Sequence, residues 1–151
     1  VEREPVDVAE LARVAVEAMR PQLPPSVELD LEVGPEEARA AGDADRIQQV
    51  LVNLLDNAVK YGEGSPVTVR VRPVDGVVHL SVQDSGPGFD PSNPEHLFDA
   101  FHTTKPHGLG MGLSISRSII DAHGGRLWAT ANVPCGAIFQ FTLPIGGERV
   151  A

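Results

Sequence analysis

The chain has 151 residues, of which 42% are hydrophobic and 22% are charged, and its formal net charge at pH 7 is −9. This length fits a single domain, expected over residues 1–151, and no apolar run approaches the ~20 residues that a membrane span requires. The acidic balance argues against nucleic acid as a partner. The one cysteine, Cys135, excludes a disulfide framework and a cysteine-based zinc site, and it is compatible with a reduced, intracellular setting.

The first half of the chain shows helix and strand patterns in alternation. Asp7 has the position of a helix N-cap, and apolar residues then recur at helical spacing as far as Met19. Prolines end that helix, and the alternation of apolar with acidic residues over 27–33 predicts a half-buried strand. Asp43 is expected to cap a second helix that runs to about Lys60.

The second half predicts strands in hairpins with one more helix between them. The expected elements are strands over 67–71 and 78–82, a helix over 111–123, and strands over 126–130 and 138–143. Asp75-Gly76 has the composition of a hairpin turn, and the Gly- and Pro-rich stretch 85–112 predicts a lid, a binding loop or a disordered segment. The order α β α β β α β β predicts a two-layer α/β sandwich, in which helices cover one face of a mixed, mostly antiparallel sheet.

Three polar side chains share one stripe of the second predicted helix, because Asn53, Asn57 and Lys60 stand at i, i+4 and i+7. The neighbouring stripe is apolar, so the amides lie along the edge of the buried face, where an unpaired amide is costly. A divalent cation and a phosphate would satisfy them, since Mg²⁺ combines a few oxygen ligands from the protein with phosphate oxygens. The alternative is a solvated helix face that carries asparagine by chance.

A second candidate site follows the strand over 78–82. Asp84 falls on the same face as the apolar residues of that strand, and a carboxylate there needs a hydrogen-bond donor. The exocyclic amine of adenine would serve, and Gly86 and Gly88 would let a flat base approach the backbone. The alternative is a plain Asp-Ser-Gly turn at the end of a strand.

The third candidate is a run of closely spaced glycines, Gly108-Leu109-Gly110-Met111-Gly112-Leu113, which leads into the third predicted helix. Glycines free backbone N–H groups to face a phosphate, and a helix N-terminus adds partial positive charge. The run matches neither the P-loop nor the dinucleotide-binding fingerprint. Lys105 lies just upstream and could reach a terminal phosphate, although a solvated loop lysine is the more common case.

Taken together, these segments resemble the N, G1, F and G2 boxes of sensor histidine kinases, which belong to the GHKL superfamily of ATPases and kinases. The matching segments are Asn53-Leu-Leu-Asp-Asn57-Ala-Val-Lys60-Tyr61, Asp84-Ser-Gly86-Pro-Gly88-Phe89, Leu97-Phe98-Asp-Ala-Phe101-His-Thr103-Thr104-Lys105 and Gly108-Leu109-Gly110-Met111-Gly112-Leu113. Segments 122–125 and 136–144 resemble the end of the same domain, so the resemblance covers about residues 5–145. It implies an α/β sandwich of the Bergerat type with an ATP lid.

The resemblance implies that the amide stripe binds ATP and Mg²⁺. Asn57 would be a magnesium ligand with Asn53 supporting it, Lys60 would contact phosphate and Tyr61 the nucleoside. The gyrase- and Hsp90-like ATPases are expected to have a glutamate where this chain has Asn53, and an uncharged amide cannot activate water as a general base. The catalytic stripe of Asn53, Asn57 and Lys60 therefore favours phosphoryl transfer to a protein over hydrolysis.

The resemblance also implies the rest of the nucleotide site. Asp84 would bind the adenine amine, and Gly86 and Gly88 would shape its pocket. The ATP lid would include Phe98, Phe101, Thr103, Thr104 and Lys105. The phosphates would lie at the segment Gly108-Leu109-Gly110-Met111-Gly112-Leu113.

Kinases of this family phosphorylate a histidine on a separate dimerisation domain, usually in a His-Glu or His-Asp pair. In this sequence no acidic residue follows any histidine: His79, His96, His102, His107 or His123. We therefore expect the catalytic domain of a protein-histidine kinase, excised from a longer chain. Its partners would be the histidine-bearing dimerisation domain and, indirectly, a response regulator; this fragment would lie in the cytoplasm without membrane contact.

Two alternatives remain open. A nucleotide-binding regulatory module without catalysis would need most of the same residues. An anti-sigma-type serine kinase of the same superfamily would share the nucleotide site, but the segment Phe98–Lys105 favours the histidine kinase.

Overall fold

A five-stranded sheet organises the part of the chain that the computed structural model describes, residues 4–34, 38–62, 64–86, 109–132 and 135–145. In spatial order its strands are β2 (Leu29–Val33), β4 (Val67–Val74), β5 (Val77–Asp84), β7 (Ala137–Pro144) and β6 (Arg126–Ala131). Strands β2 and β4 run parallel, and the other three neighbouring pairs are antiparallel. The predicted mixed, mostly antiparallel sheet is confirmed.

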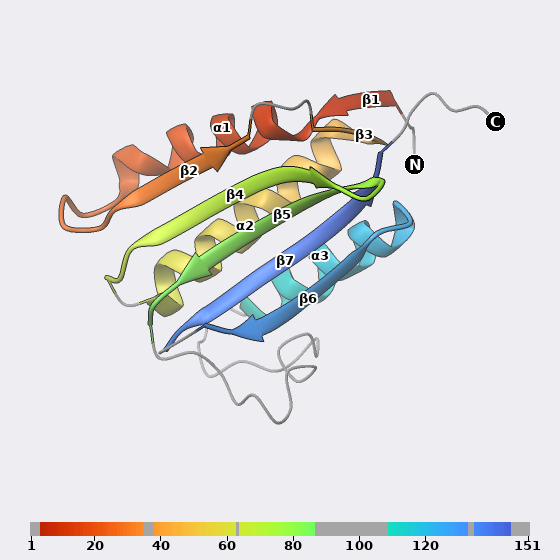
Figure 1. Cartoon of the computed structure of the whole chain (residues 1–151). Coiled ribbons are helices and arrows are strands. Elements are labelled where there is room, and N and C mark those ends of the chain that lie inside the picture. The colour runs from red at the N-terminus through yellow and green to blue at the C-terminus, as the bar shows by residue number, and fades with distance from the viewer. Residues whose placement is uncertain (1–3, 35–37, 63, 87–108, 133–134, 146–151) are drawn as a thin grey trace.

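The three α-helices of the described residues all lie on one face of this sheet, the far face in Figure 1. They are α1 (Val8–Met19), which continues into a 3₁₀ turn (Arg20–Gln22), α2 (Ala44–Gly62) and α3 (Leu109–Ala122). α2 packs between α1 and α3 and also contacts β4 and β5. The apolar faces of both layers form a single core, in which Leu54, Leu80 and Phe141 are fully buried. This is the expected two-layer α/β sandwich.

The helix-capping residues and the turn residues of the sequence act at the predicted positions. The side chain of Asp7 accepts a hydrogen bond from the backbone N–H of Glu10 and caps α1. Oδ1 of Asp43 accepts from the N–H groups at the start of α2 in the same way. Asp75 and Gly76 both have positive φ, 49° and 84°, as a tight hairpin turn between β4 and β5 requires.

A small second sheet was not predicted. Strands β1 (Glu4–Asp7) and β3 (Arg39–Gly42) pair in antiparallel register beside the start of α1. The sequence of β3, Arg-Ala-Ala-Gly, has no large apolar residue to alternate with polar ones, and alanine favours helix. Its strand conformation therefore depends on pairing with a segment more than 30 residues away, which local patterns do not reveal.

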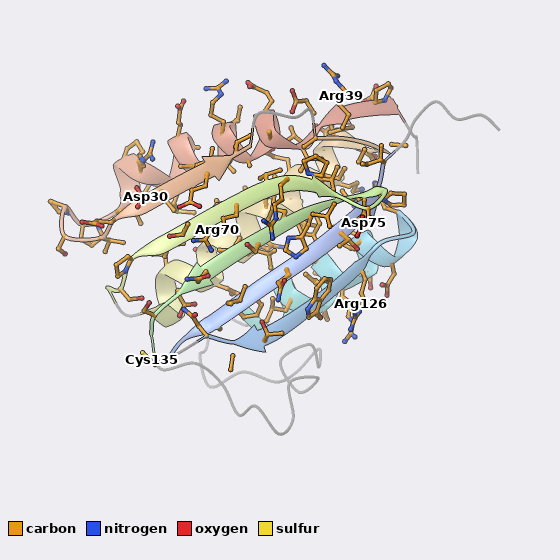
Figure 2. The ribbon with its side chains drawn as sticks, viewed as in Figure 1. Asp30, Arg39, Arg70, Asp75, Arg126 and Cys135 are labelled. Carbon is orange, nitrogen blue, oxygen red and sulfur yellow. The ribbon has the colours of Figure 1, made fainter. Side chains whose placement is uncertain are left out.

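The other face of the sheet, which is turned toward the viewer in Figure 2, carries polar side chains such as Arg70 and Arg126. The guanidinium of Arg126 lies 4.5 Å from the ring centre of Trp128. Nε2 of His79 lies 2.9 Å from Oε1 of Gln140, and His79 is on the face of β5 opposite the buried Val78 and Val82. Within the described residues, no helix is long and apolar enough to cross a membrane.

Candidate nucleotide site

Three predicted site segments meet at one end of the sandwich. β5 ends at Asp84, the second half of α2 contains Asn53 and Asn57, and α3 begins at Leu109. Figure 1 shows that the C-terminal ends of β5 and α2 and the N-terminal end of α3 lie at the same end of the sheet. The fold therefore gathers residues that are far apart in the sequence.

The amide of Asn57 is buried at the edge of α2 and lacks a partner. Its side chain is 2% exposed, and its Nδ2 has no hydrogen-bond partner among the described residues. Leaving a buried N–H donor unpaired costs about 1–3 kcal/mol. An acceptor from a bound ligand, such as a phosphate oxygen, would remove that cost. The interpretation of this stripe as a solvated helix face is wrong for Asn57, because the residue is buried.

Asn53, one turn earlier, connects α2 to α3. Its Nδ2 donates a hydrogen bond to Oγ of Ser116, at 3.0 Å, and Ser116 is fully buried. Ser116 was not among the residues predicted for the site. A signal was present, since Ser116 stands three residues after Leu113 and so shares the buried face of α3. A polar group on that face needs a partner from the neighbouring helix.

Asp84 is the last residue of β5 and is also buried, with 2% of its surface exposed. Oδ1 accepts a hydrogen bond from the N–H of Gly86 at 2.9 Å, whereas Oδ2 is buried with no partner in the described part of the chain. Burial raises the pKa of the Asp84 carboxyl above its ordinary value of 3.8, and hydrogen bonds from the backbone N–H groups of Gly86 and Ala137 oppose part of that rise. One carboxylate oxygen is thus held in place and the other needs a donor.

The turn after Asp84 is fixed by a neighbouring loop. The N–H of Ser85 donates to Oγ of Ser65 at 3.1 Å, and Gly86 is buried. Ser65 lies between α2 and β4, so this bond ties the end of β5 to the segment that follows the amide stripe. One hydrogen bond therefore links the end of β5 to the segment between α2 and β4.

The glycine run begins the third helix instead of preceding it. α3 starts at Leu109, two residues before the predicted Met111, so Gly110 and Gly112 lie in its first turn. Leu113, 3% exposed, anchors this turn in the core, and such packing overrides the low helix propensity of glycine. The first N–H groups of a helix have no partner within it, so the turn still offers N–H groups to an anion.

The structure leaves several predicted residues untested. Lys60 and Tyr61 lie in the last turn of α2, but their side chains are outside the described residues. The same holds for the side chains of Leu109 and Met111 in α3. Seven further predicted residues lie outside the described residues altogether: Gly88, Phe98, Phe101, Thr103, Thr104, Lys105 and Gly108.

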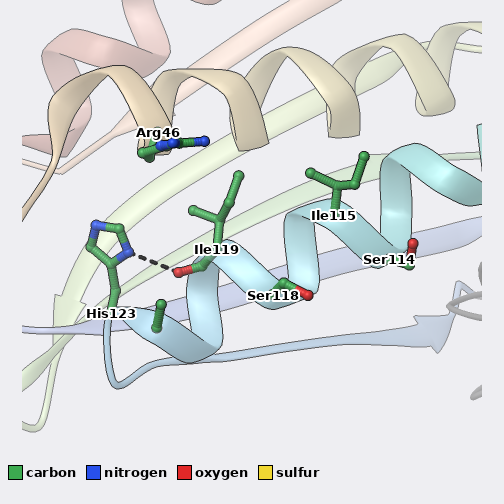
Figure 3. A pocket seen from close by; sticks show the side chains of 7 residues that line it. Arg46, Ser114, Ile115, Ser118, Ile119 and His123 are labelled. Atoms are coloured by element: carbon green, nitrogen blue, oxygen red, sulfur yellow. Dashed lines mark hydrogen bonds between the residues drawn. The ribbon is translucent and has the colours of Figure 1, made fainter. Parts of the chain in front are cut away.

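A separate hollow of about 400 Å³ runs along the outer side of α3, where Arg46 of α2 faces Ile119 and His123 (Figure 3). Its lining includes none of the predicted site residues. His123 is fully buried; Nδ1 donates to the carbonyl oxygen of Ile119 at 2.8 Å, and Nε2 accepts from the N–H of Asp43 at 3.0 Å. Nε2 thus joins the end of α3 to the start of α2, whereas Nδ1 bonds back to α3, and the role of His123 is structural.

Comparison with known proteins agrees with this arrangement. The sequence model of a family described as "Histidine kinase-, DNA gyrase B-, and HSP90-like ATPase" matches residues 42–147. The sensor protein FixL of Bradyrhizobium diazoefficiens is 43% identical over 128 residues, which cover 82% of this chain and 25% of FixL. The chain spans about a quarter of the length of FixL and of the sensor histidine kinase ZraS of Klebsiella oxytoca, which it also matches.

Solved structures give the same result. The catalytic domain of histidine kinase ThkA superposes with a TM-score of 0.86 at 33% identity, over 95% of this chain and 96% of that domain. Full-length ShkA, solved in complex with AMPPNP, gives 0.85 at 31% identity, over 99% of this chain and 32% of ShkA. ThkA has also been solved in complex with the response regulator protein TrrA, and this chain covers 42% of that ThkA with a TM-score of 0.82 at 31% identity.

Proposed function

We propose, because the chain belongs to the family of histidine kinase-, DNA gyrase B- and HSP90-like ATPases, that it binds ATP with Mg²⁺ and transfers the γ-phosphate to a histidine on a separate dimerisation domain. The observation that carries this proposal is that two buried polar atoms, Oδ2 of Asp84 and Nδ2 of Asn57, have no partner among the residues that the structure describes. They lie on elements that meet at one end of the sandwich. An adenine amine and a phosphate oxygen have the complementary chemistry.

Asp84 is the proposed adenine contact. The amine of adenine would donate to Oδ2, while the N–H of Gly86 continues to hold Oδ1. Hydrogen bonds to an ionised carboxylate are stronger than neutral ones, and the surrounding burial strengthens them further. Bound nucleotide would then stabilise the ionised form of a carboxyl group that burial otherwise disfavours.

The amide stripe of α2 fits a magnesium ion that is shared with phosphates. Asn57 is the proposed ligand and Asn53 its neighbour in the same site, because amide carbonyls are hard oxygen ligands. Bound magnesium would supply positive charge to the phosphates in a chain whose net charge is −9. The buried NH₂ group of Asn57 would donate to an oxygen of the same ligand set.

The remaining contacts stay predictions of the sequence. Lys60 and Lys105 would contact phosphate, Tyr61 the nucleoside, and the first turn of α3 would offer its N–H groups to the phosphates. Gly88 would help to shape the adenine pocket, Gly108 would lie at the phosphates, and the lid would close over the nucleotide. Its contributing residues would be Phe98, Phe101, Thr103 and Thr104.

The acceptor histidine is proposed to come from another domain. His123 is fully buried with both ring nitrogens bonded, and His79 lies on the open face of the sheet, away from the site. Asn53 cannot serve as a general base, which favours transfer over hydrolysis. By analogy with ThkA and its partner TrrA, a response regulator would receive the phosphate afterwards, in a cytoplasmic two-component system.

The test uses this chain, γ-labelled ATP and a dimerisation domain of the family that carries the acceptor histidine. We expect Mg²⁺-dependent, acid-labile label on the acceptor domain and none when its histidine is replaced by glutamine. Failure of the chain to bind ATP or ADP would overturn the proposal at its first step. Acid-stable label on a partner protein would instead indicate a serine kinase.

A further inference from the structure

The connection between β6 and β7 folds onto the turn that follows β5. Nδ2 of Asn132 donates to the carbonyl oxygen of Asp84 at 2.7 Å, and Sγ of Cys135 donates to the carbonyl oxygen of Ser85 at 3.1 Å. The N–H of Asn132 also bonds the carbonyl oxygen of Gly136 at 3.1 Å, which closes the connection on itself. In Figure 2, Cys135 lies at the end of the sheet where β5 finishes.

Gly136 allows this close approach. It is buried with φ at 107°, and a Cβ atom at this position would overlap the carbonyl oxygen of Asp84 and crowd the Cα atom of Ser85. Side chains other than hydrogen are strained at this φ. The backbone N–H of the next residue, Ala137, lies close enough to the Asp84 carboxyl group to lower its pKa. One short connection thus contacts both the main chain and the side chain of Asp84.

The pairing between β5 and β7 does not extend to Asp84. The register between β5 and β7 pairs Val77 through Gln83 and stops one residue before Asp84. On the other side, Asp84 is paired with Val67 of β4. The β6–β7 connection therefore supplies the contacts to Asp84 that the ladder with β7 no longer provides.

We infer that Asn132 and Gly136 are positioning residues for adenine recognition: without touching the nucleotide, they fix where the Asp84 carboxylate stands. This inference rests on the proposed function, since it assumes that Asp84 accepts from the adenine amine. Hydrogen bonds weaken steeply with distance and angle, so a displaced carboxylate loses discrimination between bases before it loses phosphate binding. Adenine presents an amine donor at the position where a 6-oxo purine presents an acceptor.

The first experiment compares ADP with inosine diphosphate, in which an oxo group replaces the amine, by calorimetry on the whole chain. For Asn132→Ala we expect ADP to bind about five- to tenfold more weakly, because a charge-assisted contact is misplaced, with a much smaller change for inosine diphosphate. The matched control is Thr130→Ala, which removes an exposed hydrogen bond of β6 that does not involve Asp84. Unchanged ADP affinity, or equal losses for both nucleotides, overturns the inference.

The second experiment needs no nucleotide. Hydrogen exchange in the free chain should show that Asn132→Ala weakens protection of two amides: that of Gly86, which donates to Oδ1 of Asp84, and that of Ala137, which lowers the pKa of the same carboxyl group. Unchanged protection at both amides overturns the positioning role even if ADP binding is normal. Failure of the unaltered chain to bind ADP, by contrast, would contradict both the proposed function and this inference.

Two glycine substitutions distinguish the effect of crowding Asp84 from the effect of backbone strain. Gly136→Ala and Gly76→Ala both place a side chain at positive φ, but only the first meets Asp84, since nothing lies within 4 Å of a Cβ at Gly76. We expect the Gly136 variant to lose ADP affinity at a temperature where both variants are folded, and the Gly76 variant to retain it. Equal ADP affinity of the two folded variants contradicts the inference.

Discussion

At the scale of single residues, the clearest feature is that Asp84 is better suited to a complex than to the free protein. The residue is 2% exposed, and Oδ2 of its carboxylate has no partner among the described residues. An uncharged group of the same shape would be buried at lower cost. Binding strength and stability of the free chain should therefore respond to substitution at this position in opposite directions.

We expect Asp84→Asn to weaken ADP binding by about 1–3 kcal/mol, through loss of a charge-assisted hydrogen bond. The same variant should unfold at a higher urea concentration than the unaltered chain at about pH 7, because it buries no charge. Calorimetry and urea titration check the two parts. Unchanged affinity would remove Asp84 from the site.

The pH dependence of this stability difference follows from the raised pKa of Asp84. A carboxyl group whose pKa is higher in the folded state stabilises the fold below its unfolded pKa and loses that contribution as the pH rises through the folded pKa. The advantage of the Asn variant should thus shrink as the pH falls toward the ordinary value of 3.8. Urea titrations of both proteins over this range measure it, and an advantage that grows at low pH contradicts the argument.

Asn57 should affect chemistry more than nucleotide affinity. Asn57→Ala removes the proposed magnesium ligand but leaves Asp84 and its adenine contact in place. We expect the phosphoryl-transfer rate to fall about 100-fold or more, as is typical when a group that stabilises the transition state is removed, with a much smaller change in the ADP dissociation constant. Equal losses in both quantities would point to a folding defect, which thermal unfolding of the variant would reveal.

At the scale of elements, the contact between α2 and α3 carries a polar link. The hydroxyl of Ser116 is fully buried and accepts from Nδ2 of Asn53. Ser116→Ala should destabilise the chain by about 1 kcal/mol, because the half-buried amide of Asn53 loses one of its partners. Ser118→Ala on the exposed side of the same helix is the matched control and should change stability by less than about 0.5 kcal/mol. Urea unfolding measures both, and equal effects would show that the link contributes nothing specific.

Local patterns were sufficient to predict most elements. The helices α1 and α2 begin at capping residues, and the β4–β5 hairpin turns at Asp75-Gly76, because each of these signals acts on neighbouring backbone groups. The β1–β3 sheet escaped prediction, since its strands are stabilised by each other and not by their own composition. α3 began earlier than predicted, because burial of Leu113 outweighed the glycines before it.

The residues of the candidate site also fall into two groups, those that local sequence patterns predicted and those that they did not. Asp84 and Asn57 were predicted, because each occupies an apolar face on its own element and so needs a partner. Ser116 and Asn132 were not, since their significance depends on residues 63 and 48 positions away in the chain. Sequence periodicity identifies which polar groups are buried, whereas the tertiary fold decides which groups hold them in position.

At the scale of the whole molecule, the proposed reaction needs two separate domains, this chain and the domain that carries the acceptor histidine. In the proposed reaction this chain would offer the nucleotide contacts, and the acceptor histidine would have to be brought to the end of the sandwich where β5, α2 and α3 meet. A separate acceptor domain reaches that end only by diffusion. A tethered one is present at an effective concentration on the order of millimolar for a short flexible linker.

Transfer to a separate acceptor domain should therefore be bimolecular and slow. We expect the initial rate to rise in proportion to acceptor concentration in the micromolar range, and to increase about 10-fold or more when the acceptor domain is fused before residue 1 through a flexible linker. Initial rates of acid-labile labelling, measured over a series of acceptor concentrations, check this. The fused protein should show a rate that does not depend on its own concentration if transfer occurs within one molecule. Near-stoichiometric acid-labile label on the isolated chain would falsify this division, because the phosphate would then have an acceptor within residues 1–151.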